Sequence, residues 1–211
     1  MRSRMGCIAA AALAVAFLSS PALAQQTIID EWPTVKAPPA PELKTVNVNA
    51  KTTALLMLDF VKQTCNMERR PRCIASLPIA KQLLAAARAS NVFVVYSLIP
   101  NGVIGDVLPD VAPLGSEPYV QASIDKFFKT DLEKILKDRG IETVIVTGTA
   151  AHGAVMYTGS EAVVRGFKVI VPVDAVSADN AFIEQYVAYN FTSAPSVAAA
   201  TTLTRASMIK F

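Results

Sequence analysis

Two polar side chains in this 211-residue chain lie shortly after apolar runs, where catalytic groups are often found. Asp59 comes after the run at 54–58, and His152, the only histidine, lies in the turn after the run at 144–146. A carboxyl group and an imidazole can each take up and release a proton, which is the requirement for general acid–base catalysis. Both have a structural alternative, since the aspartate could simply cap the next loop and the histidine could simply hydrogen-bond a neighbouring loop.

The two apolar runs predict the strands that position these groups. Neither run alternates polar and apolar residues, which is typical of strands buried on both faces of a parallel sheet. The turn at 149–154 leads into an amphipathic segment that predicts a helix from Gly153 onward. In a parallel sheet all strand C-termini lie at one edge, where the first backbone N–H groups of the following helices can bind an anion. We therefore expect Asp59 and the turn to face one ligand site, in which the N–H groups of residues 152–155 bind an oxyanion or a carboxylate.

The rest of the chain alternates apolar runs with helix patterns. Pro78 is expected to begin a helix that ends at Ala89, and Thr130 to cap a helix that Gly140 ends. Residues 100–118 are rich in glycine and proline and predict a loop long enough to cover a site. The alternation indicates the α/β class, with a doubly wound, mainly parallel sheet between helices. The further predicted strands are 92–99, 119–121, 167–173 and an edge strand at 202–209, and the further predicted helix is 182–191.

The N-terminus has the pattern of a secretory signal peptide. Residues 1–24 contain two arginines, an apolar run at 8–18 and the ending PALA, which fits a cleavage site. An uncleaved membrane anchor is the alternative, but the run has only half of the ~20 apolar residues that a spanning helix needs. We therefore expect a periplasmic or secreted protein, with an extended proline-rich arm at 25–51 and one domain at 52–211.

The charge balance argues against several partners. Two of the 20 basic residues lie in the leader, which leaves 18 basic residues against 17 acidic ones after cleavage. A chain so close to neutrality gives no electrostatic reason to expect nucleic acid or a membrane surface as a partner. One histidine and no C-x-x-C pair argue against a metal site, and no cofactor is expected. The expected partner is a small-molecule substrate.

Cys65 and Cys73 are the two cysteines that remain after the leader, and seven residues separate them in CNMERRPRC. A disulfide readily closes a span of this length in an oxidising compartment. The alternatives are a reactive thiol and a redox-active pair.

Four motifs, in order and in spacing, resemble the isochorismatase-like hydrolase superfamily, which includes nicotinamidases, N-carbamoyl amidohydrolases and isochorismatases. They are TALLMLDF, FxxTDLEKIL, VIVTGTAAHGAVMYT and GFKVIVPVDAVSA, and the resemblance spans residues 53–209. It implies a three-layer α/β/α fold with a six-stranded, mainly parallel sheet. Members often associate through helices and the loops near the site, so a homo-oligomer is compatible with the resemblance.

Most members of that superfamily use an aspartate, a lysine and a cysteine. The resemblance assigns the aspartate to Asp59, but the cysteine position is Ala154, and the lysine position, six residues before Phe127, is Gln121. A methyl group cannot attack a carbonyl or a nitrile, so Ala154 cannot act as the thiolate does. Lys126 is the nearest candidate to replace the lysine, and the alternative is a solvated charge beside a helix start.

Isochorismatases also lack the cysteine and carry an Ala-His pair where this chain has Ala151 and His152. In them the aspartate is thought to protonate a vinyl ether, and water then attacks without a covalent intermediate. Together with the leader pattern, the resemblance therefore implies an exported hydrolase without a cysteine nucleophile that uses Asp59 as general acid or base, with Lys126 and His152 as further catalytic candidates. The alternative is a pseudoenzyme of the same fold that binds a small ligand without turning it over. The expected substrate-binding residues are Gln121, Ala151, Gly153 and Ala154.

Overall fold

The computed structural model describes residues 26–115 and 117–211. The predicted leader, residues 1–24, lies outside this part of the chain. Residues 38–211 form one compact unit. In the shorter unit that precedes it, the helix α1 (Ile28–Glu31) follows Thr27, whose backbone N–H donates to the Asp30 carboxylate. No helix among the described residues has the length and apolar character that crossing a membrane requires.

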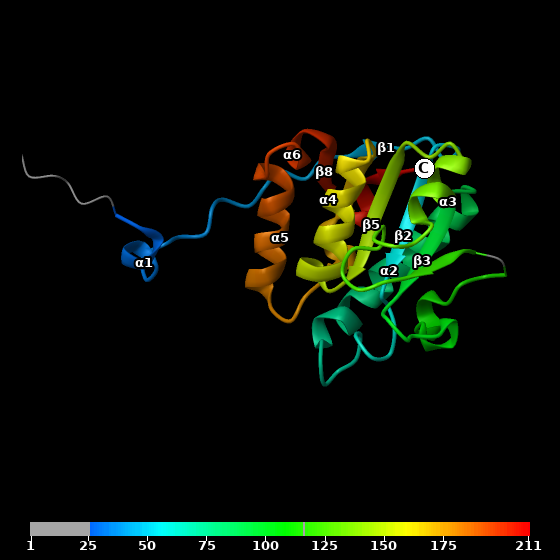
Figure 1. The fold of residues 1–211 in the computed structure, drawn as a ribbon, viewed down its shortest axis with the longest axis horizontal. Helices are drawn as coiled ribbons and strands as arrows, with labels where there is room; N and C mark the ends of the chain where they lie inside the picture. Colours follow the sequence, from blue (N-terminus) through cyan, green and yellow to red (C-terminus); the bar gives the residue numbers. More distant parts are fainter. Residues whose placement is uncertain (1–25, 116) are drawn as a thin grey trace, which may run out of the picture. The chain divides into compact units, whose positions relative to one another are not determined.

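Six parallel strands follow one another in the central sheet of the described residues, in the order β4-β3-β2-β5-β6-β8. Figure 1 labels four of them, β2, β3, β5 and β8. The two middle strands are β2 (Thr53–Leu58) and β5 (Thr143–Thr149), and a two-residue strand, β7 (Val176–Ser177), pairs with the end of β5. This arrangement confirms the predicted α/β class and the mainly parallel sheet. The other strands are β3 (Phe93–Leu98), β4 (Tyr119–Gln121), β6 (Lys168–Pro172) and β8 (Thr201–Thr204).

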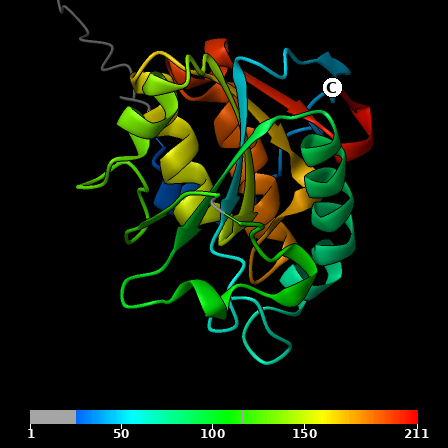
Figure 2. The same cartoon turned by 90° about the vertical axis from the view of Figure 1, so that its right-hand side faces the viewer.

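Helices cover both faces of the sheet, which gives the three predicted layers (Figure 2). The helix α2 (Pro71–Ala89) packs on one face, and the opposite face is covered by α3 (Leu132–Asp138), α4 (Met156–Val164) and α5 (Ala181–Ser193). The short helix α6 (Val197–Ala200) lies between α5 and β8 in the chain. Leu56 and Leu58 join the apolar cluster under α3 to α5, whereas Leu55 and Met57 join the cluster under α2. All six residues of β2 are therefore buried, which explains its unbroken apolar sequence.

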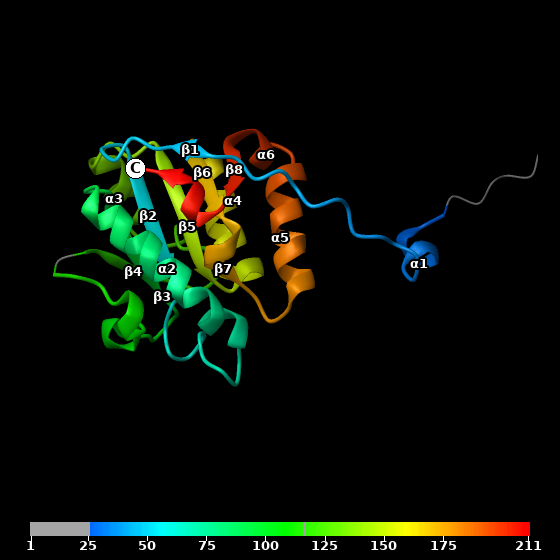
Figure 3. The ribbon, with the colours of Figure 1, turned by 180° about the vertical axis from the view of Figure 1, so that it is seen from behind.

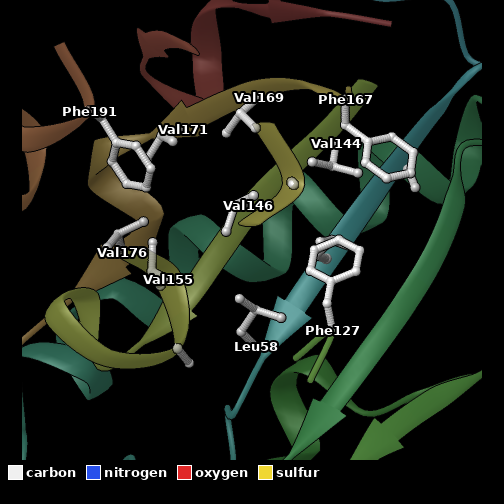
Figure 4. Packing of buried hydrophobic residues seen from close by; sticks show 14 of the residues in the cluster. Leu58, Phe127, Val144, Val146, Val155, Phe167, Val169, Val171, Val176 and Phe191 are labelled. Carbon is white, nitrogen blue, oxygen red and sulfur yellow. The ribbon is translucent and has the colours of Figure 1, made fainter. Parts of the chain in front are cut away.

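The cluster under α3 to α5 also fixes the chain that follows β4. Figure 4 shows Phe127 packed near Leu58 and Val144 of the central strands, with Phe167 beside it. The two phenylalanine rings lie 6.1 Å apart, and the side chain of Phe127 is 5% exposed. The residue before Phe127 is Lys126, so this packing holds Lys126 against the sheet.

Gly148 allows β2 and β5 to approach closely at their C-terminal ends. Its φ of +123° suits glycine, and a Cβ atom there would lie 2.0 Å from the carbonyl oxygen of Leu58. Any side chain at this position would push the two strands apart directly beside Asp59.

The helix α2 begins at Pro71, so the prediction that Pro78 begins it is wrong. Pro71 occupies the first helical turn, where a proline is well tolerated, and Pro78 lies inside the helix. The buried face of α2 extends back to Cys73, and packing of that longer face offsets the hydrogen bond that Pro78 cannot donate.

Two other helices begin at residues different from those predicted. Asp131, rather than Thr130, immediately precedes α3, although the Thr130 hydroxyl still accepts a hydrogen bond from the Leu132 N–H, and Gly140 follows the helix with a φ of +66° as predicted. The helix predicted from Gly153 starts earlier, with a wide helical turn at Ala151–Val155 that is interrupted at Gly153. The regular helix α4 begins only at Met156.

The predicted edge strand at 202–209 is divided. Its first part is β8, at the edge as predicted, but Asp174 accepts a hydrogen bond from the Ala206 N–H and a short 3-10 turn, Ala206–Met208, follows. The chain then forms β9 (Ile209–Lys210), which pairs in parallel with β1 (Val46–Asn47) in a separate two-stranded sheet (Figure 3).

Candidate active site

Asp59 and Lys126 form a buried ion pair at the C-terminal edge of the sheet. The Lys126 Nζ lies 2.8 Å from the Asp59 Oδ2, and the two side chains are 0% and 6% exposed. Asp59 follows β2 directly, and Lys126 reaches it from the loop after β4. The backbone N–H of Lys126 donates to the Thr158 hydroxyl of α4, which fixes this loop on its other side.

Lys126 has an acceptor for each of its three ammonium protons. Besides Asp59, its Nζ donates to the carbonyl oxygens of Ala122, at 2.8 Å, and Leu98, at 3.3 Å. An uncharged amine has only two protons to donate, so this environment favours the charged form. The geometry therefore favours the ionised pair, with a carboxylate on Asp59 and an ammonium on Lys126.

The second carboxylate oxygen of Asp59 is held by a serine. The Ser97 hydroxyl of β3 donates to Oδ1 at 2.7 Å, and both residues are buried. The φ of Asp59 is +53°, a region that few residues other than glycine adopt and that aspartate tolerates better than most. The chain therefore leaves strand geometry at Asp59, whose carboxylate contacts donors from β3 and from the loop after β4.

Burial changes the proton affinities of both partners. Burial raises the pKa of Asp59, while the charge and hydrogen bond of Lys126 and the hydrogen bond of Ser97 lower it less strongly. Burial lowers the pKa of Lys126, and Asp59 opposes that change. Because the two pKa values move toward each other, a proton passes between this pair more easily than between a free carboxylate and a free ammonium.

The other predicted site residues differ from this pair in their burial and in their contacts. Ala151 and Ala154 are buried, Gly153 is half-buried, and the His152 side chain is exposed. Gln121 holds a loop with its amide, which donates to the carbonyl oxygens of Ile99 and Gly102. The residue that meets Asp59 is thus Lys126, not the Gln121 found by counting back from the phenylalanine.

Some backbone N–H groups of the turn after β5 form hydrogen bonds within the turn itself. The Ala150 carbonyl accepts hydrogen bonds from the N–H groups of Gly153, at 3.0 Å, and Val155, at 3.3 Å. Two of the four N–H groups expected to bind an anion are therefore already used within the turn. The peptide bond between Thr149 and Ala150 is cis.

Arg70 is a buried residue at this edge that the sequence did not single out. Its guanidinium donates to the Thr64 carbonyl, the Thr149 hydroxyl and the Asp179 carboxylate, at 3.0–3.2 Å. These partners belong to the loop after β2, the end of β5 and the loop before α5. Thr64 in turn donates its hydroxyl to the Asp59 carbonyl, so Arg70 ties the ends of three segments together near Asp59. Its place inside CNMERRPRC was the only available signal.

Cys65 and Cys73 form the predicted disulfide, with Cα atoms 5.3 Å apart and both residues buried. It closes the loop that carries Arg70.

We expect the variant Cys65→Ser/Cys73→Ser to lose about 2–3 kcal/mol of unfolding free energy, because the open loop gives the unfolded chain more freedom. Urea unfolding of the two proteins measures the loss, and a change below about 0.5 kcal/mol would show that the disulfide adds little.

Asp106 anchors the loop after β3 to the loop after β2. It accepts hydrogen bonds from the Gln63 amide and the Val103 N–H, and it pairs with Lys62 at 2.7 Å. The hydrogen bond from Lys62 is the main cause that lowers the pKa of Asp106 to about 2, from 3.8.

The lowered pKa of Asp106 predicts an acid-dependent contribution to stability. A carboxyl group with a lowered pKa in the folded state stabilises the protein fully above 3.8 and loses that contribution as the pH falls toward 2. We expect Asp106→Asn to be less stable than the parent at pH 6 and to approach it at pH 2. Unfolding curves across this range measure the difference, and a difference that stays constant would contradict the linkage.

The described residues contain no group of three or more histidine, cysteine, aspartate and glutamate side chains arranged to hold a metal ion. The buried groups at this point of the sheet edge are a carboxylate on Asp59, an ammonium on Lys126 and a hydroxyl on Ser97.

Comparison with known proteins identifies the family. The isochorismatase domain family model matches residues 53–204, which is most of the chain, so the chain belongs to the isochorismatase family of hydrolases. The uncharacterized isochorismatase family protein YwoC of Bacillus subtilis (strain 168) is 28% identical over 159 residues, 64% of this chain and 82% of that protein.

Solved structures share the fold. An isochorismatase family protein from Desulfovibrio vulgaris superposes with a TM-score of 0.68 at 19% identity, over 74% of this chain and 95% of its own. The N-carbamoylsarcosine amidase of Thermoplasma acidophilum superposes with a TM-score of 0.59 at 23% identity, over 74% of this chain and 96% of its own. At these identities the likeness establishes the architecture, and the chemistry must be argued from the site.

Proposed function

We propose that this protein is a hydrolase of small molecules that uses Asp59 for proton transfer and needs no cysteine nucleophile. The observation that carries the proposal is the ion pair between Asp59 and Lys126, two ionisable side chains held out of water at the ligand edge of the sheet. Burying two charges costs more than their attraction commonly returns, so a pair of this kind is more readily explained by function than by stability. The similarity to an amidase supports amides and ureides as the first substrate classes to test.

The proposed reaction uses water as the nucleophile. Asp59, ionised in the resting protein, accepts a proton as water attacks the carbonyl carbon, and it returns this proton to the leaving nitrogen. Lys126 remains charged throughout and stabilises the Asp59 carboxylate before the first transfer and after the second. With a vinyl ether, the reaction would instead start from the protonated form of Asp59, which would act first as an acid. Ala154 takes no part in bond making, because its methyl group has no nucleophilic atom.

The remaining site residues have supporting roles in this proposal. Ala151, Gly153 and Ala154 form the part of the turn after β5 against which the substrate packs. The His152 side chain, which is exposed, contacts the substrate on its solvent side. Gln121 acts indirectly, by holding the loop at Ile99 and Gly102. We further propose that the protein works in the periplasm or outside the cell, which the disulfide and the leader pattern support.

The test is a turnover screen with the purified mature chain. Amides, ureides, esters and vinyl ethers are incubated with the protein, and products are followed by mass spectrometry. We expect turnover of at least one class by the wild-type protein and none by Asp59→Ala at matched concentration. Product formation at the same rate by both proteins would contradict the proposal.

A second candidate function is a small-ligand-binding pseudoenzyme. It is favoured by one observation: both carboxylate oxygens of Asp59 already have donors, and the position that would carry the nucleophile is an alanine. This candidate predicts that metabolites raise the melting temperature in a saturable manner while no product forms. Turnover by the wild-type protein would exclude it.

A further inference from the structure

Ser97 is a polar residue in a row of core side chains. It lies on β3 two residues after Val95, so the two side chains point to the same face, and Val95 packs in the cluster under α3 to α5. Ser97 is 1% exposed. A buried hydroxyl costs free energy unless it is hydrogen-bonded, and the partner of this hydroxyl is the Asp59 Oδ1, at 2.7 Å.

Ser97 holds Asp59 at two points. Besides the contact between side chains, the Ser97 carbonyl accepts a hydrogen bond from the Asp59 N–H, at 3.3 Å. The register of the sheet places Ser97 directly opposite Leu58, the residue before Asp59. The backbone of β3 therefore fixes where Asp59 leaves β2, and the hydroxyl fixes its carboxylate.

The hydroxyl supplies a constraint that Lys126 alone does not. The last torsion of an aspartate side chain is broad, so a single ion pair leaves the carboxylate plane able to turn. Lys126 holds Oδ2 and Ser97 holds Oδ1, from two different segments of the chain. With both oxygens held, the plane has one orientation, and proton transfer depends on orientation within tens of degrees.

We propose that Ser97 is a positioning residue for Asp59, whose carboxylate plane its hydroxyl fixes for proton transfer. This inference rests on the proposed function, since it assigns Ser97 a role in the same site. The charged and titratable groups that act on Asp59 are few: Lys126 contacts it directly, and Asp125 acts on Lys126. The Ser97 hydrogen bond lowers the pKa of Asp59, so its removal must raise that pKa further.

The test compares Ser97→Thr with Ser97→Val, because these side chains have nearly the same shape and differ in the hydroxyl. The carboxyl resonance of Asp59 is titrated by NMR in chains labelled with carbon-13 aspartate, and Asp59→Asn identifies the resonance. We expect the midpoint in Ser97→Val to lie roughly 0.5–1 pH unit above that in Ser97→Thr. With a turned-over substrate, we expect kcat of Ser97→Val to be about tenfold lower at unchanged KM, and Ser97→Thr to keep most of the wild-type kcat.

The control is Ser76→Ala. Ser76 is also a buried serine, but it lies on α2 and donates to the Cys73 carbonyl. The variant Ser76→Ala should leave both the titration midpoint of Asp59 and kcat as in the wild-type protein. Equal midpoints and equal kcat in folded Ser97→Thr and Ser97→Val would overturn the inference. The titration needs no substrate, so it decides whether Ser97 holds Asp59 even if the screen finds no turnover and the proposed hydrolase function fails.

Discussion

Lys126→Met is expected to lower the free energy of unfolding by about 3–5 kcal/mol, because it leaves the Asp59 carboxylate buried beside an apolar side chain. The Ala122 and Leu98 carbonyls lose their donor in the same variant, which adds to the cost. Guanidinium unfolding of the wild-type and variant proteins at pH 7 measures the loss. Lys126→Met should also raise the pKa of Asp59, since the group that opposes the effect of burial is removed.

Two controls separate the buried pair from a general effect of losing a lysine. In Asp59→Asn/Lys126→Met no charge remains in the pair, so much of the lost stability should return. Lys134→Met removes the partner of Asp138 in an exposed pair on α3 and should change stability by less than about 1 kcal/mol. If Lys126→Met cost no more than Lys134→Met, the pair would not be the closed, charged arrangement described above.

Asp59→Asn is expected to reduce kcat/KM by about 10²- to 10⁴-fold, the usual contribution of a general acid or base. The amide keeps the size of the carboxylate but cannot take up the proton. The measurement is steady-state hydrolysis at pH 7 with a substrate from the turnover screen. Asp106→Asn is the matched control, because Asp106 is also a nearly buried aspartate paired with a lysine, and its kcat/KM should stay within about twofold of the wild-type value.

The pH dependence of the wild-type reaction follows from the same pair. The rate requires an ionised Asp59, so it should fall as the pH drops through a pKa above 3.8. It also requires a charged Lys126, so it should fall as the pH rises through a pKa below 10.5. The expected profile is therefore a bell that is narrower than the ordinary values would give. A rate that stays level across both limits would remove Asp59 and Lys126 from proton transfer.

Much of the fold could be predicted from the sequence because the local patterns agree with the final packing. The unbroken apolar run before Asp59 indicates a strand buried on both faces, and β2 is such a strand. Pro78 misled the helix prediction because the buried face of α2, which begins at Cys73, outweighs the local preference of a proline. The division of the last strand depends on Asp174, 32 residues away, and a local pattern contains no trace of that contact.

The site was less predictable, since it depends on how loops cross the sheet edge. The position of Asp59 followed from its strand, but spacing alone placed the lysine at Gln121. In the structure the chain between β4 and Phe127 brings Lys126 to Asp59, and this depends on the packing of Phe127. In the sequence, nothing distinguishes Ser97 from other small residues of a core strand, because its role depends on the position of the Asp59 carboxylate.

The most direct measurement is the hydrolysis rate of the variant Cys65→Ser/Cys73→Ser, set beside Asp59→Ala, at a temperature where both are folded. Residues 25–211 contain no other cysteine, so the double variant produced without the predicted leader contains no thiol. Water attack assisted by Asp59 predicts that the double variant keeps most of the wild-type kcat and that Asp59→Ala loses it. Full activity in Asp59→Ala, or none in the folded double variant, would contradict a thiol-independent hydrolase built on Asp59 and Lys126.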